Sequence, residues 1–151
     1  MKNYQKWKEE SDKLDHRHIG QVQELFFFND LSPGSVFFYP KGAKIYSKLV
    51  ELMRHEYRVR GYEEVISPVL YNQNLWMISG HKQKFQNNMF DVQVEKQEFS
   101  LKPMNCPGHC LLFGSLPRSY RDLPMRIADF GVLHRNEVSG ALHGMVRCRK
   151  F

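Results

Sequence analysis

The chain has 151 residues, of which 42% are hydrophobic and 25% are charged, an ordinary balance for one globular domain. No apolar run approaches the ~20 residues that a membrane span requires, and the polar, partly acidic N-terminus lacks the apolar segment of a signal peptide. Three cysteines, an odd number, provide no disulfide framework and favour a reducing compartment. We therefore expect a cytoplasmic protein without a membrane partner, with the mitochondrion as the alternative location.

Positive charge is concentrated near the C-terminus. The net charge is +6, and residues 117–151 contain seven Lys or Arg against three acids, which leaves +4 in the last 35 residues. This favours a polyanionic ligand such as a nucleotide or RNA, although a solvated basic face explains the charge equally well. The basic residues are Arg118, Arg121, Arg126, Arg135, Arg147, Arg149 and Lys150.

The first third of the chain predicts helices and aromatic segments. Residues 1–15 are polar and favour a helical lead-in to a main domain at 16–151. Two aromatic runs, 26–28 and 36–39, flank the turn signal Ser32-Pro33-Gly34 and predict either strands or the floor of a pocket. Residues 43–60 carry apolar side chains at helical spacing, and Gly61 is placed to end that helix. The apolar positions are Tyr46, Leu49, Val50, Met53 and Tyr57.

The remaining segments predict an α+β domain with antiparallel strands. Residues 62–71 favour a strand with Pro68 at an edge or crossing, and residues 72–90 favour a short helix and loop. Residues 91–103 alternate like a hairpin, and Pro107 suits the first turn of a helix. Residues 124–151 predict strand, loop and strand, with the loop centred on 139–140.

The last segment offers the strongest candidate site. Arg135 and Glu137 are two residues apart, so both face the same side of a strand, and Arg147 and Arg149 repeat the spacing. A guanidinium donates two parallel hydrogen bonds to a phosphate, and a carboxylate accepts from the exocyclic amine of adenine. Ion pairing across a solvated sheet face is the alternative interpretation.

Four segments resemble the class II aminoacyl-tRNA synthetases in their threonyl-tRNA synthetase form. "FGVLHRNEVSGALHGMVRCRKF" resembles motif 2, and "RGYEEVISPVLYNQNLWMISGH" resembles motif 1 and its continuation. "DHRHIGQVQELFFFNDLSPGSVFFYPKGA" resembles the entry to the catalytic domain, and "LKPMNCPGHC" resembles the zinc-ligand segment. The four occur in family order, with motif 1 at about 43–70 and motif 2 at about 125–151. The resemblance implies an antiparallel sheet flanked by helices.

The resemblance implies a reaction and assigns roles to motif 2 residues. The reaction is the ATP- and Mg²⁺-dependent activation of threonine to threonyl-adenylate, followed by transfer to tRNA(Thr). Arg135 would hold the ATP α-phosphate and the threonine carboxylate. Glu137 would accept from the adenine amine, and Arg147 would bind the nucleotide's phosphates.

The segment 104–110 is a candidate metal and substrate site. From the residues alone, Cys106, His109 and Cys110 form an incomplete metal site, and a lone buried thiol is the commoner explanation. The resemblance implies that Cys106 alone binds a catalytic Zn²⁺, together with two histidines further along the chain. It also implies that Met104 lines the amino-acid pocket.

His81, in "SGH", resembles the family histidine that lies near the terminal ribose of tRNA and assists acyl transfer. A histidine titrates near neutrality and suits proton transfer, although a structural loop histidine is the alternative. Lys82 follows it where the family commonly has tryptophan, which places the local packing in question.

Two functional hypotheses from different classes follow. In the first, the chain is part of a threonine–tRNA ligase core that pairs with a second copy through motif 1. We expect the two zinc histidines, motif 3, the anticodon-binding domain and the editing domain to lie outside these 151 residues, so that the chain alone does not aminoacylate. In the second, a non-catalytic form dimerises with a full-length synthetase or binds RNA. Seryl or prolyl specificity is a further alternative, and "MNCPGH" argues against seryl.

Overall fold

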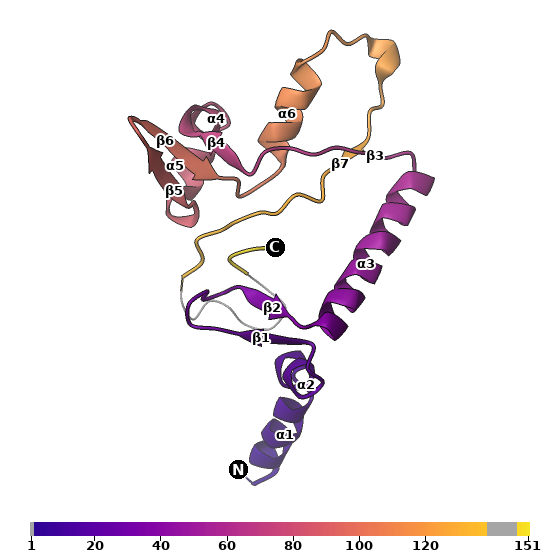
Figure 1. Ribbon diagram of the computed structural model, residues 1–151, viewed down its shortest axis with the longest axis vertical. Helices are drawn as coiled ribbons and strands as arrows, with labels where there is room; N and C mark the ends of the chain where they lie inside the picture. Colours follow the sequence, from indigo (N-terminus) through magenta and orange to yellow (C-terminus); the bar gives the residue numbers. More distant parts are fainter. Residues whose placement is uncertain (1, 139–147) are drawn as a thin grey trace. The chain divides into compact units, whose positions relative to one another are not determined.

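The computed structural model describes residues 2–138 and 148–151, and it divides into two compact units. The first unit contains residues 1–53 and 138–148, and the second contains residues 54–137 and 149–151. Among the described residues, no helix combines the length and apolar character needed to cross a membrane. Figure 1 shows the helices and strands of both units.

The first unit begins with two helices and an aromatic hairpin. Helix α1 is Lys2–Lys13 and helix α2 is His16–Val22, whose first turn is capped by the Asp15 carboxylate accepting from the Arg17 amide at 2.7 Å. Strands β1 (Phe26–Phe28) and β2 (Val36–Phe38) pair antiparallel, with Phe27 opposite Phe37 and their rings 5.0 Å apart. The aromatic runs are therefore strands, which confirms one of the two interpretations of this segment.

Helix α3 (Pro40–Val59) confirms the predicted amphipathic helix and starts three residues earlier, because proline suits the first helical position. Gly61, with φ of +74°, follows its end as predicted. The apolar stripe of α3 is largely exposed: Tyr46 is 56% exposed, Leu49 57% and Met53 43%. The helix thus presents an apolar surface rather than the core side expected of a simple amphipathic helix.

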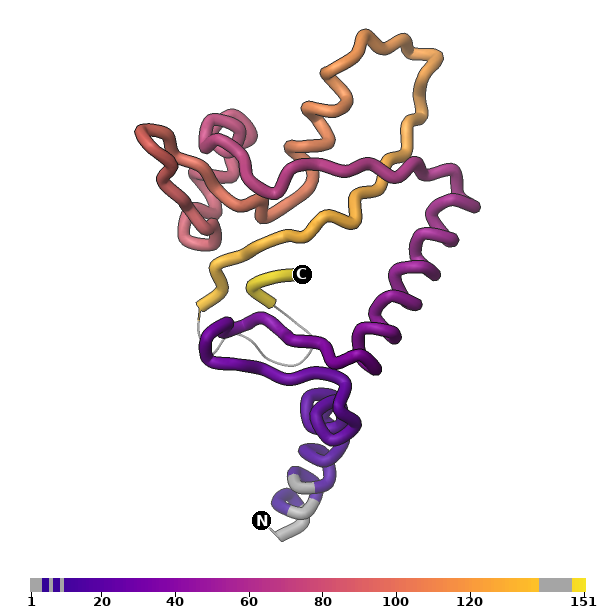
Figure 2. Tube along the Cα trace, viewed as in Figure 1, coloured from indigo at the N-terminus to yellow at the C-terminus, as the bar shows by residue number. Residues whose placement is uncertain are grey.

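The second unit contains two small sheets. Strand β3 (Glu63–Glu64) pairs parallel with β7 (Ile127–Ala128), and the two segments of the trace cross in the view of Figure 2. Strands β4 (Leu70–Asn72), β6 (Gln97–Leu101) and β5 (Asp91–Val94) form an antiparallel sheet in the order β4-β6-β5. The predicted hairpin at 91–103 is confirmed. The predicted strand at 62–71 is two short strands, because Pro68 lies between them and cannot donate to a ladder.

Short helices complete the second unit. Helices α4 (Gln73–Ile78) and α5 (His81–Phe85) lie beside the β4-β6-β5 sheet (Figure 1), followed by the 3₁₀ turn η1 (Gln86–Asn88). Helix α6 (Cys106–Gly114) has proline in its first turn, as predicted, and is followed by the 3₁₀ turn η2 (Tyr120–Asp122). Trp76 and Met89 are the buried large apolar side chains among the described residues. Helices flanking small antiparallel sheets confirm the α+β class.

Residues 133–135 and 149–151 meet in an antiparallel bridge, but the longer pair of strands predicted over 124–151 does not form among the described residues, where the strand of this segment is β7, parallel to β3. Leu133 and Phe151 exchange backbone hydrogen bonds of 2.7 and 3.1 Å, and His134 bridges to Lys150. The predicted loop centre at 139–140 lies outside the described residues, as does Arg147.

Candidate functional site

Arg135 is fixed in orientation by two contacts. Its Nε donates to the carbonyl oxygen of Pro103 at 3.2 Å, and its guanidinium carbon lies 4.8 Å from the centre of the Phe151 ring. A planar guanidinium that is already stacked on an aromatic ring loses little freedom when it binds an oxyanion. Arg135 is therefore preorganised for a phosphate or a carboxylate.

The register of the C-terminal strands places a second arginine beside Arg135. The Arg135 amide donates to the Arg149 carbonyl oxygen at 2.9 Å, so these residues are directly opposite and project from the same face. Arg149 donates from Nε and Nη2 to the carbonyl oxygen of Glu137 at 3.3 and 3.2 Å. The Glu137 residue is 8% exposed. Arg147 lies outside the described residues, so its place on this face stays a prediction.

The structure brings His81 and Met104 into contact. His81 Nε2 lies 3.2 Å from Met104 Sδ, and His81 Nδ1 lies 2.9 Å from Ser79 Oγ. The imidazole ring also meets the buried Trp76 ring edge-on, with centroids 5.8 Å apart. Pro103, the residue before Met104, accepts a hydrogen bond from Arg135. His81 and Arg135 therefore both contact the Pro103–Met104 dipeptide.

Cys106 is an exposed thiol in the first turn of α6 rather than a buried one. An exposed thiol at a helix N-terminus is accessible to a metal ion. Across residues 2–138 and 148–151, no group of three His, Cys, Asp or Glu side chains is placed to hold a metal. Cys106 therefore fits the role of one zinc ligand, and the described residues supply no complete site.

The structure reveals a buried polar cluster that the sequence did not indicate. The Lys102 and Asp129 side chains are each 1% exposed and form an ion pair with Nζ and Oδ2 3.3 Å apart. Ser67 Oγ donates to Asp129 Oδ2 at 2.5 Å and accepts from Lys102 Nζ at 2.9 Å. The alternation of Phe99 and Leu101 predicted the hairpin but gave no sign that Lys102 is buried beyond it. We call Ser67, Lys102, Asn105, His109, Asp129 and Gly131 the Asp129 cluster.

Two ionisable groups near the site have displaced pKa values. Burial raises the pKa of Asp129, but the Ser67 hydroxyl, the Gly131 amide and Lys102 together hold it below the usual 3.8. Burial, with a smaller contribution from Lys150, lowers the pKa of His134 below 6.5. Both groups adjoin the strand that continues to Arg135.

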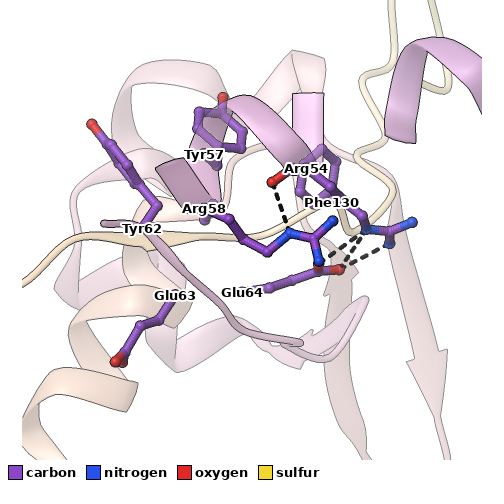
Figure 3. A pocket seen from close by; sticks show the side chains of 8 residues that line it. Arg54, Tyr57, Arg58, Tyr62, Glu63, Glu64 and Phe130 are labelled. Atoms are coloured by element: carbon purple, nitrogen blue, oxygen red, sulfur yellow. Dashed lines mark hydrogen bonds and ion pairs between the residues drawn. The ribbon is translucent and has the colours of Figure 1, made fainter. Parts of the chain in front are cut away.

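A separate cavity of about 390 Å³ lies at the end of α3 (Figure 3). Arg54 binds the Glu64 carboxylate through Nε and Nη2 and lies 4.9 Å from the centre of the Phe130 ring. Arg58 Nε donates to the Arg54 carbonyl oxygen at 3.3 Å. None of the predicted site residues lines this cavity, whose walls come from the motif 1 region and from Ala128 and Phe130 of the motif 2 region. Its lining residues are Arg54, Tyr57, Arg58, Tyr62, Glu63, Glu64, Ala128 and Phe130.

Sequence comparison matches the chain to synthetases along its whole length. A family model described as "tRNA synthetase class II core domain (G, H, P, S and T)" matches residues 84–151. Threonine–tRNA ligase 1, cytoplasmic, of Rattus norvegicus is 60% identical over 151 residues, which is 100% of this chain and 22% of the relative. Threonine–tRNA ligase, cytoplasmic, of Caenorhabditis elegans is also 60% identical, with 21% of the relative covered. The chain thus spans about a fifth of the length of these relatives.

Structural comparison agrees. The RNA binding domain of threonyl-tRNA synthetase from Cryptosporidium parvum Iowa II superposes with a TM-score of 0.86 and 54% identity, covering 91% of this chain and 34% of that one. Prolyl-tRNA synthetase of Giardia lamblia, 24% identical with a TM-score of 0.77 over 87% of this chain and 28% of that one, shares the fold. Together, these matches show that residues 84–151 contain a class II tRNA synthetase core-domain sequence and that the whole chain is closely similar to one segment of the threonyl-tRNA synthetases.

Proposed function

We propose that this chain carries the part of a threonine–tRNA ligase active site that binds ATP and threonine. In this proposal, Arg135 contacts the ATP α-phosphate and the threonine carboxylate, Glu137 accepts from the adenine amine, and Arg147 binds the nucleotide's phosphates. Met104 lines the threonine pocket, and His81 assists transfer of the threonyl group to tRNA(Thr).

The observation that carries the proposal is the placing of Arg135. Its guanidinium is held by Pro103 and Phe151, and Arg149 lies opposite it on the same face. Negative charge grows on the non-bridging oxygens of the α-phosphate during attack by the threonine carboxylate. An arginine that is already oriented stabilises this charge without reorganising, by about 3–4 kcal/mol for one such donor.

Two metals belong to the proposal. Mg²⁺ would accompany the ATP phosphates. Zn²⁺ would be held by Cys106 together with ligands from outside the described residues, and it would bind the amino and hydroxyl groups of threonine, which valine cannot match. Cys106 supports this role because its thiol is exposed in the same segment as Met104.

The test measures binding of threonyl-sulfamoyl-adenosine, a stable analogue of threonyl-adenylate, to the purified chain by calorimetry. We expect binding, and we expect Arg135→Ala to weaken it by about 100-fold or more. Arg60→Ala is the matched control, because Arg60 pairs with Glu56 on α3 away from the site. Equal weakening by both substitutions would contradict the assignment of Arg135. Threonine-dependent ATP–pyrophosphate exchange tests the prediction that the chain alone is inactive.

A second candidate function is a dimerisation or RNA-binding module. The exposed stripe of Tyr46, Leu49 and Met53 favours pairing through motif 1, with a second copy or with a full-length synthetase. The Cryptosporidium parvum domain, named for RNA binding, favours a tRNA contact. Light scattering and filter binding to tRNA distinguish these activities: a dimer that Leu49→Asp dissociates supports the interface, and retention of tRNA without analogue binding supports the module.

We further propose a cytoplasmic location and a boundary near residue 15. The relatives named cytoplasmic support the location. The boundary is supported by the end of α1 at Lys13 and the start of α2 at His16.

A further inference from the structure

Three residues of one segment converge on a single aspartate. Lys102, Asn105 and His109 belong to the stretch that runs from the end of β6 into α6, and all three approach Asp129. Met104 and Cys106, the proposed threonine and zinc residues, lie within the same stretch. Asp129 itself follows β7, on the segment that continues to Arg135.

The Asp129 carboxylate is fully engaged by its surroundings. Oδ1 accepts from the Gly131 amide at 2.7 Å, whereas Oδ2 accepts from Ser67 Oγ at 2.5 Å and from Lys102 Nζ at 3.3 Å. Ser67 precedes β4, so the carboxylate joins three segments that are distant in sequence. Its orientation is therefore determined by the fold and not by solvent.

The backbone and the α6 side add two further contacts. The Asp129 carbonyl oxygen accepts from Asn105 Nδ2 at 3.3 Å. His109 Nε2 lies 3.8 Å from Asp129 Oδ2, on the first turns of the helix that begins with Cys106. Lys102, before Met104, and Asn105, after it, therefore both hydrogen-bond to Asp129, and His109 lies close to the same carboxylate.

The Arg135 strand is joined to the same stretch by backbone bonds. The His134 amide donates to the Lys102 carbonyl oxygen at 3.0 Å, and the Lys102 amide donates to the Val69 carbonyl oxygen at 2.8 Å. Arg135 Nε then donates to Pro103. A displacement of Lys102 would therefore move Pro103, Met104 and the contact with Arg135 together.

We propose that Asp129 is the positioning residue of the candidate active site: with Lys102 and Asn105, it fixes the Met104–Cys106 segment against the strand that carries Arg135. The inference rests on the proposed function, since it assigns Asp129 to the geometry of that same site. Asp129 touches no substrate in this scheme and acts through Lys102 and Asn105.

The burial of the pair supports a role in geometry over one in stability. Two buried charges lose hydration that their attraction only partly replaces, and apolar side chains of the same size often stabilise a fold equally well. What the pair provides, and an apolar pair does not, is a fixed direction between two segments. Replacing Lys102 and Asp129 by an uncharged pair therefore distinguishes a role in positioning the segment from a role in stabilising the fold.

The experiment compares Asp129→Asn, Lys102→Met and the double variant with the native chain. Asp129→Asn leaves the Lys102 ammonium buried without its counter-charge, so it lowers the melting temperature strongly. The double variant removes both charges and restores most of the melting temperature, because the effects of paired charges are not additive. Asp91→Asn is the matched control. Asp91 accepts from a lysine and a serine, Lys82 and Ser100, as Asp129 does from Lys102 and Ser67, but it lies outside the 102–109 stretch.

Two measurements on the double variant, whose stability is restored, test whether the ion pair positions the segment. In the double variant, we expect amide hydrogen exchange to accelerate selectively in residues 103–109 and 131–135, whereas Asp91→Asn leaves these residues unchanged. We also expect threonyl-sulfamoyl-adenosine to bind the double variant about tenfold or more weakly than the native chain.

A double variant that recovers native exchange and native affinity together with its melting temperature would overturn the proposal, because the pair would then only stabilise the fold. If the native chain does not bind the analogue, the proposed function of this segment fails. Positioning is then decided by exchange alone: selective acceleration in 103–109 supports it, and unchanged exchange overturns it.

Discussion

His81 and Met104 touch through a ring nitrogen and a thioether sulfur, with Nε2 3.2 Å from Sδ, although they are 23 residues apart in the chain. The contact joins the start of α5 to the segment between β6 and α6. The residue proposed to line the threonine pocket is therefore the residue against which the proposed transfer histidine rests. A side chain that changes shape at position 104 changes the surroundings of both.

This contact predicts a selective effect of Met104→Ala. We expect threonyl-sulfamoyl-adenosine to bind about tenfold more weakly, because loss of the side chain removes one wall of the amino-acid pocket and the support of His81. ATP binding should stay within about twofold, since Met104 is not assigned to the nucleotide. Calorimetric titrations with the analogue and with ATP measure the two effects. Met104→Leu, which keeps the volume, should retain most of the affinity, and equal losses for both ligands would contradict the assignment.

Gly131 should tolerate no side chain. A Cβ at this position would lie 2.5 Å from Lys102 Nζ and 2.7 Å from Asp129 Oδ1, and Lys102 has no room to retreat because it is buried and paired. We expect Gly131→Ala to lower the free energy of unfolding by about 1–3 kcal/mol. Gly114→Ala is the control: nothing lies within 4 Å of its Cβ, and the change should shift stability by less than about 1 kcal/mol. Urea denaturation of both variants measures the difference.

Asp129 should make stability depend on pH in the acid range. Its pKa is lower in the folded chain than the usual 3.8, so the unfolded chain binds a proton first as the pH falls. The stabilisation is complete above 3.8 and is lost as the pH falls through the folded-state pKa. Urea titrations between neutral and acid pH should show the native chain losing stability relative to Asp129→Asn over this range. A constant difference between the two proteins at every pH would exclude the carboxylate as the cause.

His134 predicts a second dependence at higher pH. Burial, and then Lys150, lower its pKa below 6.5, so the unfolded chain protonates this group more readily than the folded chain. Stability should be full above pH 6.5 and fall as the pH decreases toward the folded-state pKa. Melting curves of the native chain and of His134→Gln test this, since the variant should lose the slope in this range. Parallel slopes would show that other groups cause the dependence.

The β5-β6 hairpin contains a residue in an unfavourable conformation. Glu95, in the turn between Val94 and Gln97, has φ of 54°, a region in which glycine carries no steric penalty. We expect Glu95→Gly to raise the free energy of unfolding by about 0.5–1 kcal/mol. Glu98→Gly is the control within β6, where glycine should destabilise instead. Thermal unfolding of the two variants should show shifts of opposite sign.

Local patterns predicted most of the elements. Helix α3 followed from apolar residues at helical spacing, and its end followed from Gly61. The β5-β6 hairpin followed from alternation, and the start of α6 followed from Pro107. The split of the strand at 62–71 was not predicted. Pro68 was expected to lie at an edge or a crossing of one strand, but its missing amide hydrogen ends the pairing on both sides of it.

Only part of the candidate site could be predicted from the sequence. The spacing predicted that Arg135 shares a face with other arginines if the two C-terminal segments pair, and the hydrogen bond from its amide to the Arg149 carbonyl oxygen agrees with that pairing. The contact of His81 with Met104 and the burial of Lys102 depend on how distant segments pack. A lysine is rarely buried, so its sequence neighbours give no reason to expect an ion pair with Asp129.

The aromatic strands β1 and β2 impose a practical condition on all of these measurements. Phe37 and Phe38 remain 43% and 45% exposed, and each strand belongs to a short apolar window of the kind that stacks into intermolecular fibrils once a hairpin opens. Asp30, Pro33 and Pro40 interrupt these windows and limit their growth. Concentrated samples of the chain should therefore aggregate from this end first, and solubility should improve when the exposed Phe37 is replaced by threonine.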